Sequence, residues 1–557
     1  MLLLLLEAAL ILPPLVRPLI VALKPEVGAG LPGASEGWTL QNLIDIYALA
    51  EYRRPLITTV ILSLVVTCLA SLTGLVLAFI VNRTDVPGRS LWELAVILPF
   101  FLSPFSTAIA WVSLGAPRTG YINTFFEAIG FGRLIDIFTF SGVTWVMVTA
   151  FVPVAYLAIS GPMRSMDGSI EEAALMVGAK PRQVLTRITL PVLAPGILAS
   201  AVLILVLAAE IYSIPALIGL PGGVASLPWT SISLTQNWPP QYGHAAAATS
   251  VLLLLTALGM AYYSRITRKS HKFITVGGKG AKPRIIALGR WKWACITILA
   301  VYVGLSMVLP YLALLFSSFQ TFATANILNV KLTLDNYSYI FSSPNLMRSI
   351  VNTVIVSAIA ATLALLLVVA AAYGAVRGRS RLWNVVEWLI MLPVALPGVI
   401  IGFGVLWTYV ASPLYGTILL LILINVIRWQ SFGIGVTKAG LYQIDGSLEE
   451  AARMQGAGAL RAVFTISLPL IRRSLMAAWL FMIVMSMKEL AASILVASAR
   501  NTVLAVATWD LAIAGEFNKA AALAIVQTLL MLALILITAK VFRIDIRNMG
   551  GSVEHAK

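Results

Sequence analysis

Apolar stretches long enough to cross a membrane alternate with short polar segments along the whole chain. A helix that spans the hydrocarbon core of a bilayer needs about 20 predominantly apolar residues. On this criterion we expect two sets of six spans. They lie at residues 2–23, 56–81, 91–114, 143–159, 193–218 and 245–263, and at 293–316, 350–373, 385–409, 417–436, 475–496 and 520–539. The pattern therefore predicts an all-α, polytopic membrane protein with about 12 transmembrane helices.

A polar segment separates the fourth and fifth spans of each set, and the two segments share one motif. The first reads Asp-Gly-Ser-Ile-Glu-Glu-Ala-Ala at 167–174, and the second reads Asp-Gly-Ser-Leu-Glu-Glu-Ala-Ala at 445–452. In both, the glutamate before Ala-Ala precedes a glycine by 6 residues and a proline by 19. A polar motif repeated at fixed spacing, 278 residues apart, indicates an internal duplication.

Each motif predicts a short capped helix. A serine followed three residues later by a glutamate is a capping box, which satisfies backbone N–H groups of the first turn. A glycine after the last helical residue is placed to end the helix in the left-handed conformation. These residues are Ser169, Glu172 and Gly178 in the first copy and Ser447, Glu450 and Gly456 in the second. The alternative is a capped helix that lies on the membrane surface without a partner.

The duplication extends beyond this motif. At an offset of 294 residues, polar residues of the first half match those of the second: Asn42 and Asn336, Thr59 and Thr353, Glu93 and Glu387. Six spans return the chain to its starting side, so the halves have the same orientation. We expect a first half at residues 1–264, a basic cytoplasmic linker at 265–291 and a second half at 292–557.

Composition supports the membrane assignment. Hydrophobic residues make up 59% of the 557, charged residues make up 11%, and mean hydropathy is +0.93. The net charge of +16 does not indicate nucleic acid, because basic residues cluster in segments between the spans, most densely at 265–292. This is the positive-inside pattern, and it places both termini in the cytoplasm.

The few residues that could bind metal or form disulfides are widely separated. The two cysteines are Cys68 and Cys295, and the three histidines are His244, His271 and His555. We therefore expect no disulfide framework, no metal site and no cofactor. The apolar start lacks a basic region and a cleavage site, so no removed signal peptide is expected. The sequence leaves open whether the native N-terminus begins upstream of Met1.

The repeated motif resembles the EAA loop of bacterial ABC importer permeases, the segment that docks on the ATPase subunit. The resemblance implies the type I importer (MetI-like) fold, duplicated in one chain, in a bacterial or archaeal cytoplasmic membrane. It implies two copies of a cytoplasmic ABC ATPase and a periplasmic or lipid-anchored solute-binding protein as partners. It also implies that the ATPase-coupling residues are Ser169, Glu171, Glu172, Ala173, Ala174 and Gly178, with Ser447, Glu449, Glu450, Ala451, Ala452 and Gly456.

Two other classes of protein compete with this interpretation. Twelve spans in two halves also describe a secondary transporter, but the loop at 82–89 matches the charged motif of the major facilitator class poorly. A membrane-embedded enzyme would need a cluster of nucleophile and base, which the sequence does not suggest. The chain contains no G-x-x-x-x-G-K-[S/T] segment, so a permease of this kind is not itself an enzyme and depends on a partner for ATP hydrolysis.

The cargo is harder to read from the sequence. Residues 487–495, Met-Lys-Glu-Leu-Ala-Ala-Ser-Ile-Leu, resemble the Lys-Glu-Leu-Pro-Ala-Thr-Leu-Leu stretch of ferric-iron permeases. Ala491 replaces the proline of that stretch and Ser493 replaces the threonine. Ferric iron is the expected cargo, and thiamine, polyamines and phosphonates are the alternatives.

Charges inside the spans are candidates for the translocation path, because burying them in lipid is costly. Glu210, Lys488 and Glu489 follow the motif prolines at equivalent distances, and we expect them to face the path. The alternative is that Lys488 pairs with a carboxylate and holds helices together. Arg428 and the matched Glu93 and Glu387 are expected to have structural roles.

Overall fold

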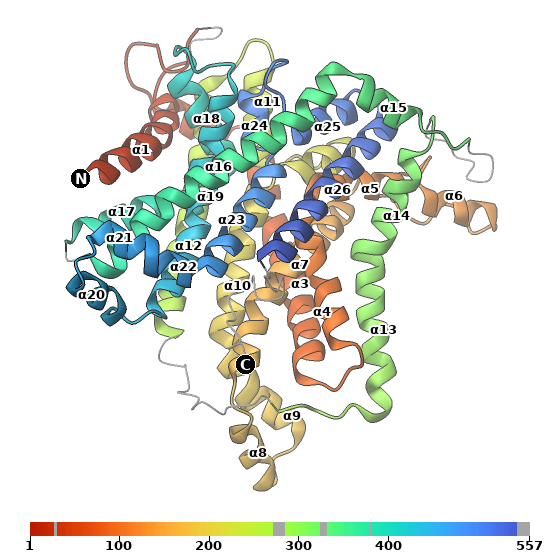
Figure 1. Cartoon of the computed structure of the whole chain (residues 1–557). Helices are drawn as coiled ribbons and strands as arrows, with labels where there is room; N and C mark the ends of the chain where they lie inside the picture. Colours follow the sequence, from red (N-terminus) through yellow and green to blue (C-terminus); the bar gives the residue numbers. More distant parts are fainter. Residues whose placement is uncertain (27–29, 271–283, 323–330, 379, 543–557) are drawn as a thin grey trace. The chain divides into compact units, whose positions relative to one another are not determined.

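The computed structural model describes residues 1–26, 30–270, 284–322, 331–378 and 380–542 (Figure 1). Within these ranges the secondary structure is helical apart from two isolated β-bridges. The chain forms two compact units, and each unit combines segments from both halves of the sequence. Among the described residues, unit 1 lies within 1–53, 230–253 and 337–542, and unit 2 lies within 54–229 and 254–336.

Unit 1 begins with two helices from the start of the chain and is completed by the second half. Its elements are α1 (Leu2–Ala22), α2 (Gln41–Ala48), α15 (Asp335–Ser342), α16 (Pro344–Arg377), α17 (Leu382–Met391), η8 (Leu392–Ala395), α18 (Gly398–Tyr409), α19 (Ile418–Tyr442), α20 (Ser447–Met454), α21 (Ala459–Ala462), η9 (Val463–Ser467), α22 (Leu468–Leu470), α23 (Arg472–Met487), α24 (Ser493–Val496), α25 (Leu504–Ile513) and α26 (Phe517–Phe542).

Unit 2 contains most of the first half and the opening helices of the second. Its elements are α3 (Ala50–Arg83), α4 (Arg89–Ile97), η1 (Leu98–Phe101), α5 (Pro104–Gly115), α6 (Tyr121–Ala128), α7 (Phe140–Ser165), α8 (Ser169–Met176), α9 (Pro181–Val184), η2 (Leu185–Thr189), α10 (Leu190–Glu210), η3 (Pro215–Gly219), η4 (Leu220–Gly222), η5 (Gly289–Trp291), α13 (Lys292–Val303), η6 (Gly304–Val308) and α14 (Leu309–Ser318). Helices α11 (Leu227–Gln236) and α12 (Tyr242–Ser270) contribute residues to both units, and so do α3 and α15, through their first residues.

The expected spans are present, but several are broken. Nine helices of the described residues are long and apolar enough to cross a membrane, or up to 13 if each of four bent pairs counts as one span. The spans expected at 91–114 and 385–409 are bent by 98° and 111°. Each break lies just before a proline, Pro104 or Pro397, which disfavours helix in the residue that precedes it. Each of these two expected spans therefore consists of two helical segments that meet at a bend.

The fifth span of each half ends earlier than expected. The first was expected to reach residue 218, but α10 ends at Glu210, and Ile211 is extended. The second was expected to reach residue 496, but α23 ends at Met487 and is bent by 70° from the short helices before it. In both halves the charged residues considered for the path therefore lie where a helix ends rather than in mid-helix.

The opening helix of each sequence half packs in the unit built mainly from the other half. Helix α1 lies along α18, and α14 lies against α5 (Figure 1). The contact of α1 with α18 is close: a Cβ atom at Gly404 would lie 1.8 Å from the carbonyl oxygen of Pro14. Only glycine leaves room for the backbone of α1 at this point.

Matched polar residues make equivalent contacts in the two units. The amide of Asn42 donates to the carbonyl oxygens of Ala22 (3.0 Å) and Lys24 (2.7 Å) at the end of α1. The amide of Asn336 donates in the same way to two carbonyl oxygens at the end of α14, at 2.9 and 2.8 Å. The residues that match at an offset of 294 thus make the same pair of hydrogen bonds to the end of a helix in both units.

A second matched pair, Thr59 and Thr353, fixes the start of a helix. The hydroxyl of Thr59 accepts from the backbone N–H of Leu227 at 2.8 Å, at the first residue of α11. The hydroxyl of Thr353 accepts from that of Leu504 at 2.7 Å, at the first residue of α25. Such bonds satisfy N–H groups that a helix start leaves open.

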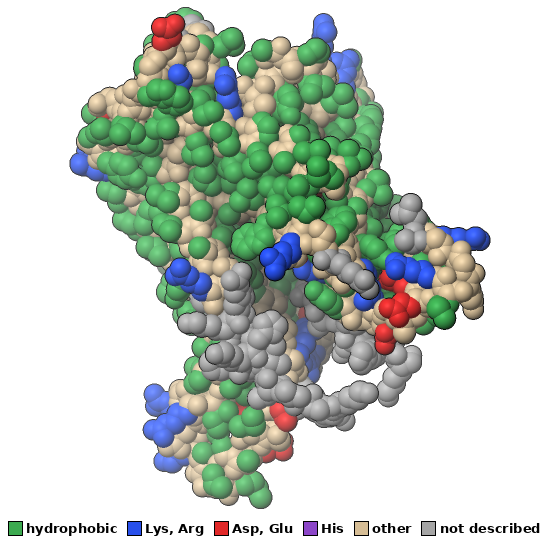
Figure 2. Space-filling model, turned by 90° about the vertical axis from the view of Figure 1, so that its left-hand side faces the viewer, with side chains coloured by type: hydrophobic (Ala, Val, Ile, Leu, Met, Phe, Trp, Pro, Cys, Tyr) green, Lys and Arg blue, Asp and Glu red, His purple; other side chains and the backbone are tan. Residues whose placement is uncertain are grey.

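Hydrophobic side chains cover a broad area of the face shown in Figure 2. Large apolar residues are exposed on several of the long helices, among them Leu64, Leu72, Leu366 and Leu536. Exposure of this extent is typical of a surface that contacts lipid.

Candidate functional site

The repeated motifs form two short helices, α8 and α20, which we term the coupling helices. The capping boxes expected for Ser169 with Glu172 and for Ser447 with Glu450 are not formed. In both copies the helix begins at the serine, and the preceding glycine is the cap residue without a side-chain hydrogen bond. This prediction was wrong.

An aspartate performs the capping instead. Asp167 accepts a hydrogen bond from the backbone N–H of Ser169 at 2.9 Å, and Asp445 accepts one from that of Ser447 at 3.0 Å. These backbone hydrogen bonds lower the pKa of both aspartates below their ordinary value. A carboxylate is the stronger acceptor, and its negative charge is favourable at a helix N-terminus.

The C-terminal ends match the sequence prediction. Gly178 and Gly456 adopt the left-handed conformation, with φ of 91° and 88°. The residue after each glycine donates its N–H to the carbonyl oxygen of Ala174 or Ala452, at 3.0 Å in both copies. This is the Schellman arrangement, and a residue with a Cβ atom would be strained at either glycine. Both coupling helices are therefore closed by the same turn.

One glutamate of each Glu-Glu pair is buried. In α8, Glu171 is 2% exposed and pairs with Arg83 at the end of α3. The second carboxylate oxygen of Glu171 accepts from the hydroxyl of Thr189 at 2.6 Å. The coupling helix of unit 2 is thus joined to a long apolar helix and to the start of α10.

The second copy repeats this arrangement. Glu449 is 3% exposed and accepts from the hydroxyls of Ser467 (2.7 Å) and Tyr373 (2.8 Å) and from Nε of Arg377 (3.4 Å). Burial alone would raise the pKa of Glu449, but the hydrogen bonds from Ser467 and Tyr373 and the charge of Arg377 lower it below its ordinary value. We call Glu171–Arg83 and Glu449–Arg377 the two clamps.

Sequence reasoning assigned the buried glutamates to the coupling motif but missed their partners. The sequence does contain a pattern that could have identified these partners. Arg83 and Arg377 are 294 residues apart, which is the offset that also relates Glu93 and Glu387.

The opposite side of each coupling helix is open to solvent. Met176 is 89% exposed and Met454 is 91% exposed, and Ala174 and Ala452 are half-buried. Other exposed residues include Ile170, Glu172, Ala173 and Val177 in α8 and its cap, and Leu448, Glu450, Ala451 and Arg453 in α20. Each coupling helix therefore combines a carboxylate fixed inside with a small, partly apolar surface outside.

Each unit contains a further ion pair, and the glutamates of the two pairs are matched in sequence. Glu93 of α4 pairs with Arg164 of α7, and Glu387 of α17 pairs with Lys438 of α19. Arg164 also donates from Nε to Asn82 at 2.7 Å. Both glutamates thus join neighbouring helices, in line with the structural role expected for them.

The candidate path residues lie at helix ends in separate units. Glu210 is the last residue of α10 in unit 2 and is half-buried. Lys488 and Glu489 follow α23 in unit 1. Glu489 is 5% exposed, and its carboxylate pairs with Nε of Arg428 at 2.6 Å. Sequence reasoning considered Lys488 as the partner of a carboxylate and did not connect Arg428 with Glu489.

Removing Arg428 alone should destabilise unit 1. The side chains of Arg428 and Glu489 are only 11% and 4% exposed, so Arg428→Met removes the ion-pair partner of a buried carboxylate, at a cost of about 3–5 kcal/mol. Arg428→Met combined with Glu489→Gln should recover much of the loss. The measurement is the yield and thermal unfolding of the purified protein. Equal behaviour of the single and double variants would contradict the pairing.

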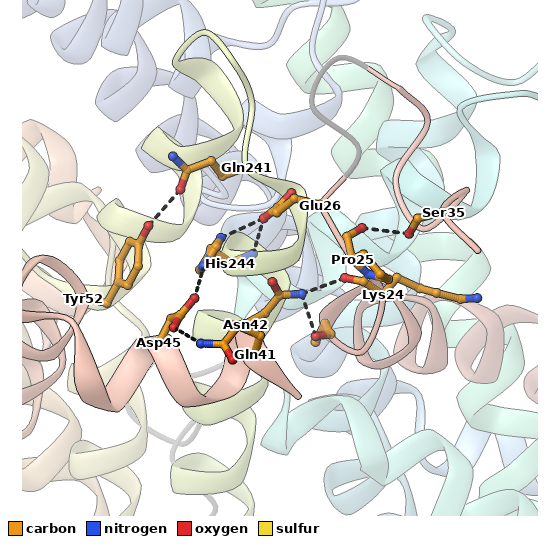
Figure 3. Close-up of polar contacts among 11 residues, drawn as sticks. Lys24, Pro25, Glu26, Ser35, Gln41, Asn42, Asp45, Tyr52, Gln241 and His244 are labelled. Carbon is orange, nitrogen blue, oxygen red and sulfur yellow. Dashed lines mark hydrogen bonds and ion pairs between the residues drawn. The ribbon is translucent and has the colours of Figure 1, made fainter. Parts of the chain in front are cut away.

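A polar cluster near the start of α12 joins three segments of unit 1 (Figure 3). Nδ1 of His244 lies 2.8 Å from Glu26, and Nε2 lies 2.9 Å from Asp45 of α2. The ring of Tyr52 stacks on the imidazole at 5.2 Å. Because the two carboxylates lie on opposite sides of the ring, they do not converge on one point as metal ligands would. The cluster ties the chain after α1 to α12.

The carboxylates of this cluster are held ionised. Burial alone would raise the pKa of Glu26, but hydrogen bonds from His244 lower it. Hydrogen bonds from His244 and Gln41 lower the pKa of Asp45. Among the described residues, no group of three or more His, Cys, Asp or Glu is arranged to hold a metal ion.

The fold defines a membrane protein made of two copies of one helical domain, each with a coupling helix. Family comparison identifies that domain: the description "binding-protein-dependent transport system inner membrane component" matches residues 70–272 and again residues 364–544. The chain belongs to this family, and the double match confirms the duplication. It is a permease of the ABC importer class, so the interpretations as a secondary transporter and as an enzyme are set aside.

Among its relatives, the chain is 28% identical over 472 residues to the ferric transport system permease protein FbpB of Actinobacillus pleuropneumoniae, covering 83% of this chain and 67% of the relative. It is 28% identical over 473 residues to the putative ferric transport system permease protein FbpB 1 of Haemophilus influenzae, covering 83% and 73%. A solved bacterial ABC transporter involved in alginate import aligns at 18% identity and a TM-score of 0.36, covering 46% of this chain and 96% of that one.

Proposed function

We propose that this chain supplies both transmembrane halves of an ATP-driven importer for ferric iron, with two ATPase subunits below it and a solute-binding protein above. The observation that carries the proposal is the pair of coupling helices, built alike and anchored alike. Two equivalent helices in one chain suit two identical ATPase subunits, one for each helix. Family membership supports a binding protein as partner.

The clamps suggest how movement of an ATPase reaches the membrane helices. The outward surface of each coupling helix, with Met176 or Met454 at its end, is the docking surface for one ATPase. The inward carboxylate is bonded to an arginine at the end of α3 or α16. A force on the coupling helix therefore acts directly on a long helix of the same unit. Closure of the ATPases moves each unit as a body between two states.

The cargo assignment is supported by the relatives named as ferric transport permeases, which align over 83% of this chain. Glu210, Lys488 and Glu489 remain the candidates for lining the path, with Arg428 added as the partner of Glu489. The test is uptake by vesicles that contain the chain, its ATPase and its binding protein, with ferric iron, thiamine, a polyamine and a phosphonate offered in turn. Uptake of one of the other three without iron uptake would overturn the cargo assignment.

The proposed orientation places both termini and both coupling helices in the cytoplasm. In a version without Cys68 and Cys295, a cysteine at Met176 should react with a membrane-impermeant thiol reagent only from the cytoplasmic side. A cysteine at Phe131, which is 72% exposed in the segment between α6 and α7, should react only from the outer side. Labelling of both positions from the same side would contradict the topology.

A further inference from the structure

A groove opens on unit 1 where the end of α1 meets the end of α18, helices that lie side by side in Figure 1. Its volume is about 380 Å³. Apolar walls from α1 and the segment after it combine with three polar side chains, and no acidic residue is among the described residues that line it. The residues that matter are Val16, Ile20 and Leu31 for the walls, and Arg17, Trp407 and Thr408 for the polar groups.

Each of the three polar side chains of the groove has one hydrogen-bond donor that lacks a partner among the described residues. Nη2 of Arg17 donates to the carbonyl oxygen of Pro32 at 3.1 Å, which holds the guanidinium in place. Its Nε is buried without a partner among the described residues, as are the indole Nε1 of Trp407 and the hydroxyl of Thr408. Trp407 is only 3% exposed, so its N–H does not reach bulk water.

These donors define the chemistry of a ligand. Guanidinium and indole nitrogens donate hydrogen bonds and cannot accept them. A buried donor without an acceptor costs free energy, and the cost is larger for a charged group. An acceptor-rich, negatively charged group in the groove would remove that cost for Arg17 and Trp407 together.

The groove lies at the level of the helices where lipid headgroups are expected. Arg17 is five residues before the end of α1 at Ala22, about 8 Å along the axis. Trp407 is two residues before the end of α18. Tryptophan and arginine near the end of a span are typical of the membrane interface.

The outer face of α1 offers a surface for acyl chains next to the groove. Leu12, Val16 and Leu19 are 40%, 43% and 37% exposed. Val16 both lines the groove and belongs to this exposed face. A ligand that is anionic at one end and apolar at the other fits the combined surface better than a small anion does.

We propose that this groove binds a membrane phospholipid through its phosphate. Arg17 and Trp407 donate to the phosphate oxygens, and the acyl chains lie along the exposed side chains of α1. The binding site belongs to unit 1 alone and does not depend on the identity of the cargo or on the ATPases.

The experiment measures thermal unfolding of the full-length protein in detergent as phosphatidylglycerol is added. Trp407→Phe keeps an aromatic side chain at this position and removes the N–H, so the apparent affinity of the folded variant for the lipid should fall about tenfold. In Arg17→Gln the apparent affinity for the lipid should fall by at least as much. Arg53→Gln, which changes an exposed arginine of the same unit, is the matched control and should leave the affinity unchanged.

The outcomes separate the sources of phosphate. Stabilisation by phosphatidylglycerol, but not by inorganic phosphate at the same concentration, supports the lipid site. Equal stabilisation by inorganic phosphate would show a site for free anions and overturn the proposal. An unchanged lipid affinity in Trp407→Phe would also overturn it, and this variant remains informative even if Arg17→Gln does not fold.

Discussion

Glu171→Ala should detach the first coupling helix and abolish transport. The substitution leaves the guanidinium of Arg83, whose side chain is fully buried, without its counter-charge. Two nitrogens of Arg83, Nε and Nη1, already lack partners among the described residues, so no alternative bond is at hand. Loss of one member of a buried pair costs about 3–5 kcal/mol. The measurements are thermal unfolding, protein yield and the ATPase activity that the chain stimulates in its partner.

The second clamp provides a matched control for this prediction. Glu449→Ala removes the equivalent carboxylate, but the side chain of Arg377 is 22% exposed and can be hydrated. We therefore expect a smaller loss of stability in Glu449→Ala than in Glu171→Ala. Glu171→Met with Arg83→Met should recover yield, because neither charge remains buried. A loss in Glu449→Ala that equals or exceeds the loss in Glu171→Ala would contradict this account of the clamps.

Met176→Asp combined with Met454→Asp should leave the chain folded and prevent binding of the ATPase. Both side chains are about nine-tenths exposed, so little packing is lost within the chain. A charge in place of an apolar contact in a docking surface is expected to cost about 2 kcal/mol, or about thirtyfold in affinity. Co-purification and the ATP hydrolysis rate measure the effect.

Controls for this double variant are present in the same chain. Phe131→Asp changes another exposed apolar side chain, away from the coupling helices, and should leave ATPase binding intact. Glu172→Lys and Glu450→Lys should weaken binding without unfolding α8 or α20, because neither glutamate caps its helix. Full ATPase binding by the variant with both methionines replaced would contradict the proposal that the ATPase docks on α8 and α20.

The sequence predicted the spans and the duplication well, because both depend on local composition and spacing. The 278-residue repeat locates α8 and α20, and glycine chemistry closes each helix as expected. The prediction of capping boxes was wrong because an aspartate two residues before each serine, Asp167 or Asp445, caps the helix in place of the serine hydroxyl. A motif that fits two capping patterns cannot decide between them by spacing alone.

Features that depend on contacts between residues far apart in the chain could not be predicted from the sequence. Hydropathy locates Arg428 and Glu489 in apolar surroundings, but only the packing of α19 against the chain after α23 joins them. The breaks before Pro104 and Pro397 illustrate a different limit. An apolar run gives the length of a span, whereas its direction depends on where the backbone leaves the helix.

The packing of α1 and α14 bears on how the protein is made. Unit 1 needs residues 1–53 and 230–253 from one half of the sequence together with residues from the other, and unit 2 is composed in the same way. Translated as separate polypeptides, neither half would carry a full set of parts for either unit. Fusion in one gene supplies the two sets in equal number and at high effective concentration, so that every molecule carries the parts of both units.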